Sequence, residues 1–139
     1  MAKKPKILCV DDQLLNLRVR TALLEQFGCE TVAATDHRSA LHVVEQTPVD
    51  LVVIDYHLAN GETGDAIARD VRASHPGIAL VMLTGDHQVP SHVAACVDAI
   101  LVKGMSDPTA LLDLIEKLLP NAALRPRRPM IFSKRPESS

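Results

Sequence analysis

The chain has 139 residues, of which 47% are hydrophobic, 23% charged and only 2% aromatic. This length and composition predict one globular domain with an aliphatic core. So few aromatic rings argue against a stacking platform for single-stranded nucleic acid. The net charge is −2, and residues 121–139 carry five basic side chains against one acidic, so residues 1–120 are acidic. An acidic body argues against nucleic-acid binding by the folded part.

The three cysteines, Cys9, Cys29 and Cys96, are odd in number and have no CxxC spacing. This pattern argues against a disulfide framework or a zinc site and favours free thiols in a reducing compartment. No apolar run approaches the roughly 18 residues of a membrane span, and residues 1–5 lead straight into a strand rather than a signal-peptide core. We therefore expect a cytoplasmic protein without a membrane segment.

The first half of the chain predicts two strands, each followed by a helix. A short apolar strand over 6–10 precedes a helix over about 13–27, and Gly28 stands where a helix commonly ends. A strand over 29–34 follows, and Asp36 is suited to cap a helix over about 37–46 that Pro48 closes. The residues expected to form the apolar stripe of the first helix are Leu14, Leu17, Val19, Ala22, Leu23, Leu24 and Phe27.

Residues 51–55 read Leu-Val-Val-Ile-Asp and predict a third strand, buried on both faces. A helix from Glu62 or Gly64 to Ser74 comes next, and then a strand over 78–83, a weaker helix over about 89–96 and a strand over 99–102. Asp107 and Pro108 open a final helix that Pro120 stops. This alternation predicts a doubly wound parallel sheet of the α/β class.

The composition changes after residue 120. Residues 121–139 hold three prolines among basic residues and end in two serines, which predicts a disordered tail or a linker stub. We expect the small apolar patch over 130–132 to remain solvated. The predicted domain therefore covers residues 1–120.

Reactive side chains stand at the ends of four predicted strands. Asp11 and Asp12 follow the first strand, Asp55 ends the third, and Thr84 and Lys103 follow the fourth and fifth. Right-handed crossovers bring these ends to one edge of the sheet. Crowded carboxylates repel unless a cation lies among them, and Mg²⁺ favours such oxygens together with a phosphate oxygen. Singly, the acidic pair could cap a helix, the threonine could belong to a turn and the lysine to the surface. Together they predict a pocket for phosphoryl transfer to a carboxylate.

With these residues the chain resembles, from about Lys6 to Leu119, the receiver domain of two-component response regulators. The resemblance implies a flavodoxin-like (βα)5 fold with strand order 2-1-3-4-5. It implies that a sensor histidine kinase or a histidine phosphotransfer protein phosphorylates Asp55, and that the chain is a phosphoacceptor with slow autodephosphorylation rather than an enzyme. It also implies Mg²⁺, or alternatively Mn²⁺, and a site that consists of Asp11, Asp12 (the more direct ligand of the pair), Asp55, the backbone carbonyl of His57, Thr84 and Lys103.

The same resemblance implies output by conformational change. The downstream target is not identified, and the face formed by the fourth helix, fifth strand and fifth helix could bind it or a second copy of the chain. His57 and Asp86 would flank the path of the attacking water and tune hydrolysis, unless they are merely solvated loop residues.

The chain departs from the family pattern at several positions. Ile100 replaces the aromatic residue whose rotamer reports phosphorylation, and Leu58-Ala59 replaces a Met-Pro pair. The loop to Gly64 is one residue longer, so we expect rearrangement at residues 60–61. Gly104 replaces a proline, and because a non-proline cis bond costs about 2.5–4 kcal/mol, we expect a trans peptide before it.

Two other functions are weighed against the receiver. A haloacid dehalogenase-type phosphatase would need a carboxylate at the position of His57 and a cap domain. A receiver-like module that binds partners without phosphorylation is compatible with the missing aromatic residue, but the complete acid, hydroxyl and lysine set weighs against it. No output domain follows Pro120, so we expect a stand-alone receiver or one cut from a larger protein.

Overall fold

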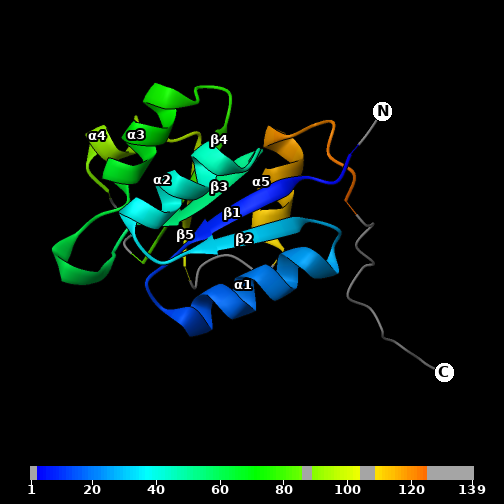
Figure 1. The fold of residues 1–139 in the computed structure, drawn as a ribbon, viewed down its shortest axis with the longest axis horizontal. Coiled ribbons are helices and arrows are strands. Elements are labelled where there is room, and N and C mark those ends of the chain that lie inside the picture. The colour runs from blue at the N-terminus through cyan, green and yellow to red at the C-terminus, as the bar shows by residue number, and fades with distance from the viewer. Residues whose placement is uncertain (1–2, 86–88, 104–108, 125–139) are drawn as a thin grey trace.

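The computed structural model describes residues 3–85, 89–103 and 109–124. Its parallel sheet has the order β2-β1-β3-β4-β5, which confirms the predicted flavodoxin-like fold (Figure 1). The strands are β1 (Lys6–Val10), β2 (Glu30–Ala34), β3 (Leu51–Asp55), β4 (Ala79–Thr84) and β5 (Ala99–Val102). The helices are α1 (Leu14–Gln26), α2 (His37–Gln46), α3 (Asp65–Ser74), α4 (Ser91–Ala94) and α5 (Ala110–Leu118).

Helices cover both faces of the sheet. Figure 1 shows α1 and α5 on one side and α2, α3 and α4 on the other. Because successive side chains of a strand point to opposite faces, β1 contributes to two separate cores. Ile7 and Cys9 pack in the core beneath α1 and α5, whereas Leu8 and Val10 pack beneath α2 and α3. All five residues of β3 are buried, as predicted for a central parallel strand.

Two helix ends form as the sequence predicts. After α1, Gly28 has a φ of 98°, and the amides of Gly28 and Cys29 donate to the carbonyls of Glu25 and Leu24 at 3.1 and 3.0 Å. This is the Schellman arrangement, which needs a left-handed residue where glycine stands. Before α2, the Asp36 side chain accepts a hydrogen bond from the Ser39 amide at 2.8 Å, within a reciprocal capping box.

The predicted apolar stripe of α1 is wrong at three positions, because Leu14, Val19 and Ala22 are exposed. Leu17 and Leu24 are buried, but Leu14 and Val19 are 66% and 64% exposed, beside Leu15 at 73%. Leu17 and Leu24 lie two turns apart on one face, whereas at 100° per residue Val19 points nearly opposite to Leu17. Helix α1 therefore presents an apolar surface to solvent, formed by Leu14, Leu15 and Val19.

Other boundaries differ modestly from the predictions. Helix α4 is confined to Ser91–Ala94, and a 3₁₀ turn over Ala59–Gly61 precedes α3. The described part of α5 begins at Ala110, while its predicted cap at 107–108 lies outside the described residues, as do the peptide bond before Gly104 and the tail from 125 onward. Within the described residues, Lys3 pairs with Ala122, and no helix is long and apolar enough to cross a membrane.

Two of the thiols belong to the core. Cys9 and Cys29 are buried and free, and Cys96 is free and partly exposed. Burial raises the pKa of Cys9 to about 12 and that of Cys29 to about 11. These two thiols therefore stay protonated near neutral pH and act as small apolar side chains.

The start of α3 presses directly on the end of β3. A Cβ atom at Gly64 would lie 2.5 Å from the carbonyl oxygen of Asp55 and 2.6 Å from Cγ2 of Ile54. The Gly64 amide also donates to the carbonyl of Tyr56 at 2.8 Å. Only glycine allows this approach, so the loop after β3 returns tightly to the strand that it leaves.

We expect Gly64→Ala to destabilise the fold by about 1–3 kcal/mol, because a backbone carbonyl cannot move aside for the added methyl group. Gly77→Ala is the matched control, since a Cβ there meets no atom within 4 Å. It should change the free energy of unfolding by less than about 1 kcal/mol. Urea unfolding measures both values, and equal losses would contradict the close approach.

Candidate functional site

Three carboxylates meet at the carboxyl edge of the sheet. Asp11 and Asp12 follow β1 and Asp55 ends β3, and one oxygen from each lies within 4.8 Å of the others. The parallel pairing of Val10 with Ile54 puts these strand ends side by side. The sheet order reverses between β1 and β3, which is the point where ligands gather in open α/β sheets.

Asp11 is the most enclosed of the three, with no exposed surface. One carboxylate oxygen accepts a hydrogen bond from the Gln13 amide at 3.0 Å, and the other lies 3.5 Å from Nη1 of Arg20 on α1. Its own amide donates to the Ala34 carbonyl at 3.2 Å. The side chain is therefore held from α1 while its backbone is held from β2.

Asp55 is 5% exposed and forms an ion pair with Lys103, whose Nζ lies 2.9 Å from Oδ1. Burial raises the pKa of Asp55 above its ordinary value, and the charge of Asp11 adds to this rise, whereas the Lys103 ammonium group opposes it. The lysine therefore favours the ionised carboxylate that a nucleophile needs.

Thr84 and Lys103 stand at neighbouring strand ends. Thr84 is fully buried as the last residue of β4, and its carbonyl accepts a hydrogen bond from the Lys103 amide at 2.7 Å. On the other side of β4, the Tyr56 amide, just after β3, donates to the Leu83 carbonyl at 2.8 Å. The main chain thus holds the end of β4 between the acidic residues and the lysine.

The loop after Asp55 folds back on itself. His57 is exposed, forms an isolated antiparallel bridge with Thr63, and has its ring 4.8 Å from that of Tyr56. At the expected point of rearrangement, Asn60 and Gly61 have φ values of 63° and 75°, both in the left-handed region. The other residue expected near the water path, number 86, lies outside the described residues.

This donor set fits a hard divalent cation. All three side chains offer carboxylate oxygens, the ligands that Mg²⁺ prefers, and their mutual repulsion is relieved by a positive charge. Arg20 and Lys103 each touch one of them at the rim. A parallel five-stranded sheet with such a cluster at its switch point defines a class of α/β proteins that bind a cation and a small anionic group.

The comparison with protein families identifies that class. The response regulator receiver domain matches residues 7–118, which is most of the chain. The chain therefore belongs to the response regulator receiver domain family, and it is a phosphoacceptor domain rather than a classical enzyme. The phosphatase alternative is set aside on this ground.

Solved structures agree with this assignment. The chain is similar to the response regulator TrrA of Thermotoga maritima, solved in complex with Mg²⁺ and BeF, with a TM-score of 0.75 and 26% identity over 83% of this chain and 99% of that one. It is also similar to the chemotaxis response regulator CheY4 of Vibrio cholerae, with a TM-score of 0.75 and 25% identity over 84% of this chain and 99% of that one.

The curated relatives are longer proteins. The sensor histidine kinase GacS of Pseudomonas protegens is 28% identical over 98% of this chain, and the transcriptional regulatory protein ZraR of Escherichia coli is 32% identical over 64% of it. The chain spans only 15% and 20% of their respective lengths.

Sequence reasoning missed one residue of the pocket, Arg20. Arg20 contacts the enclosed Asp11, but along the sequence it is one of two arginines in α1. Its spacing of nine residues from Asp11 becomes meaningful only once the turn between β1 and α1 is known. The structure brings Asp11, Asp12, Asp55 and Lys103 together, and it puts Thr84 at the end of the neighbouring strand β4.

We expect Asp12→Asn to stabilise the metal-free protein by ~1 kcal/mol, because it removes one of three mutually repelling charges. The same change should weaken Mg²⁺ binding at least tenfold, since a carboxylate ligand is lost. Urea unfolding without metal and Mg²⁺ titration followed by Tyr56 fluorescence measure the two effects. Glu45→Gln, on the exposed surface of α2, is the control that should change neither. A loss of stability in Asp12→Asn would contradict the repulsion.

Proposed function

We propose that the chain accepts a phosphoryl group on Asp55 from a phosphohistidine of a sensor histidine kinase or a histidine phosphotransfer protein, and passes the signal on by conformational change. The observation that carries this proposal is the ion pair between Asp55 and Lys103 inside a cluster of three carboxylates. Such a pocket binds a cation and holds a nucleophile at the same edge of the sheet.

In the proposed reaction, an Asp55 carboxylate oxygen forms a bond to phosphorus. The bond between phosphorus and the donor's imidazole nitrogen breaks, and its electron pair returns to the imidazole ring. Lys103 moves from the carboxylate to a phosphoryl oxygen, which its long flexible stem permits. The Thr84 hydroxyl, at the end of the neighbouring strand, donates to another oxygen of the same group.

The residues proposed to hold the cation are Asp11, Asp12, Asp55 and the backbone carbonyl of His57. When bound, Mg²⁺ neutralises the acidic oxygens and stabilises the charge of the transferring phosphoryl group. Mn²⁺ has the same preference for oxygen and is proposed as a substitute. Between transfers, Arg20 keeps Asp11 in place through its contact at 3.5 Å.

The phosphohistidine protein is proposed to dock on the exposed apolar surface of α1, formed by Leu14, Leu15 and Val19. Helix α1 begins two residues after Asp12, so this surface borders the pocket that the phosphohistidine must enter. Exposed aliphatic side chains become favourable when a partner covers them. The flanking Arg18 is exposed and favours an acidic surface on that partner.

Output is proposed through the face of α4, β5 and α5, which would bind a target protein or a second copy of the chain. Ile100, in place of an aromatic residue, is partly buried and packs against the core on the side of α2, α3 and α4. We further propose that residues 1–120 act as one receiver unit in the cytoplasm, that residues 121–139 serve as a tail or linker, and that His57 and Asp86 tune hydrolysis.

Incubation with acetyl phosphate and Mg²⁺ should add the mass of one phosphoryl group to the intact chain. Asp55→Asn should remain unmodified, because an amide oxygen is a poor nucleophile, and chelation of Mg²⁺ should abolish the reaction in the parent chain. Intact-mass spectrometry measures the product. A parent chain that stays unmodified but still binds partner proteins would instead favour the interaction module that works without phosphorylation.

Phosphotransfer tested against the histidine kinases of the source organism identifies the donor, and Leu15→Lys then tests where it docks. We expect this change to slow transfer from that kinase at least tenfold, because burying an unpaired charge at an interface is costly. Labelling by acetyl phosphate should not change, since a small donor needs no docking surface. His42→Lys, on the exposed side of α2, is the control. Equal transfer rates in both variants would exclude α1 as the docking surface.

A further inference from the structure

A further buried carboxylate, besides those of Asp11 and Asp55, lies outside the phosphoacceptor pocket. Asp65 is the first residue of α3 and is 6% exposed. The Thr63 hydroxyl donates to one of its oxygens, and Nη1 of Arg69 donates to the other at 2.7 Å. Burial by itself raises the pKa of Asp65, but these two hydrogen bonds outweigh it and hold the pKa below its usual value. Asp65 is therefore charged at neutral pH.

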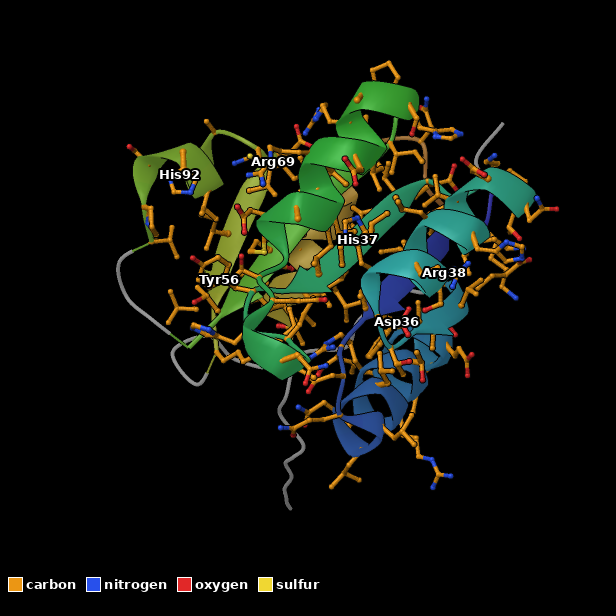
Figure 2. All side chains as sticks on the ribbon, turned by 60° about the vertical axis from the view of Figure 1, so that its left-hand side comes forward. Asp36, His37, Arg38, Tyr56, Arg69 and His92 are labelled. Atoms are coloured by element: carbon orange, nitrogen blue, oxygen red, sulfur yellow. The ribbon has the colours of Figure 1, made fainter. Side chains whose placement is uncertain are left out.

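Two groups of the neighbouring α4 segment approach this carboxylate and its arginine. Nε2 of His92 lies 3.9 Å from Oδ2 of Asp65, the oxygen that Arg69 also contacts. The Cys96 thiol donates to the His92 carbonyl at 3.0 Å, and Cys96 contributes, after Asp65, to a raised pKa of Arg69. Figure 2 shows His92 on α4 and Arg69 on α3, near each other above Tyr56. The contact of His92 with Asp65 and that of Cys96 with Arg69 join the α4 segment to α3.

Helix α4 is too short to hold its position by itself. It has only four residues, its N-terminal Pro90 provides no side-chain cap, and Val93 is its buried residue. Helices this short are not stable by their own hydrogen bonds. The position of α4 therefore depends on the packing of Val93 and of its flanking residues Val89, Cys96 and Val97 against the core, and on the polar contacts to α3.

Both partners are tied to the phosphoacceptor pocket through the main chain. On one side, Asp65 directly follows Gly64, which packs on the carbonyl of Asp55, and Thr63 pairs with His57. On the other side, α4 is the element that follows Thr84. A group bound between Asp55 and Thr84 consequently acts on both ends of the contact between α3 and α4.

We propose that Asp65, Arg69, His92 and Cys96 form a latch that holds α4 against α3 in the resting protein and opens when Asp55 is phosphorylated. This inference rests on the function proposed above. A phosphoryl group draws the Thr84 end of β4 toward Asp55, and α4 moves with it. The closed latch stabilises only the resting arrangement. It therefore lowers the affinity for a phosphoryl group by the same factor by which it shifts the equilibrium toward the resting arrangement.

The test uses His92→Gln, which keeps a polar side chain at an exposed position and removes the imidazole. The matched control is His37→Gln, because Nε2 of His37 lies 2.8 Å from Oδ2 of Asp70 and joins α2 to α3 without reaching α4 (Figure 2). The probe is beryllofluoride with Mg²⁺, followed by the fluorescence of Tyr56, which is the sole tyrosine and adjoins Asp55.

We expect His92→Gln to bind beryllofluoride about two- to fivefold more tightly than the parent chain, the factor that corresponds to one partly exposed polar contact. Cys96→Ala, which cuts the other contact, should shift the affinity in the same direction, and His37→Gln should leave it unchanged. In the absence of beryllofluoride, hydrogen exchange at residues 91–96 should be faster in His92→Gln than in His37→Gln.

The outcomes separate the latch from the proposed function. If the parent chain binds beryllofluoride but His92→Gln and His37→Gln behave alike in both measurements, the latch is wrong and the proposed function stands. If no variant binds beryllofluoride, the proposed function fails. In that case the proposed coupling of the latch to phosphorylation is overturned as well. Hydrogen exchange still shows whether the contacts hold α4 in the resting protein.

Discussion

The repulsion among three carboxylates at the centre of the sheet is the constraint on which the rest of this structure depends. Asp11, Asp12 and Asp55 converge within 4.8 Å because the parallel ladder between β1 and β3 leaves their strand ends no room to separate. The protein tolerates this because cationic side chains approach from both sides, Arg20 from α1 and Lys103 beyond β5. The remaining negative charge makes the pocket receptive to a divalent cation.

The same crowding connects the pocket to its surroundings. The loop that leaves Asp55 returns to it at Gly64, and the lysine beyond β5 is bonded through its amide to Thr84. These contacts connect Asp55 to the start of α3 and to the strand that leads to α4. In the proposed function this connection carries the signal, and the contacts between Asp65 and His92 lie where its two branches meet.

The errors of the sequence-based prediction have a common physical cause. Leu14 and Val19 were assigned to the core because they are apolar, yet the helix turns them toward solvent beside the pocket. Helix α4 is shorter than its apolar pattern indicated, since its position depends on neighbours that the local sequence does not specify. In both regions the departures from local rules fall on surfaces to which we assign a partner or a movement.

The sequence by itself determined the strands and their order along the chain, because buried parallel strands appear as continuous apolar runs. It also determined which reactive residues stand at the strand ends, and the right-handed crossovers put those ends at one edge of the sheet. It also determined the helix ends at Gly28 and Asp36, which depend on local backbone chemistry. Only the tertiary structure decided that Arg20 reaches Asp11, that Gly64 packs on Asp55 and that Asp65 faces His92. These contacts join residues through the relative placement of whole elements, which no local spacing encodes.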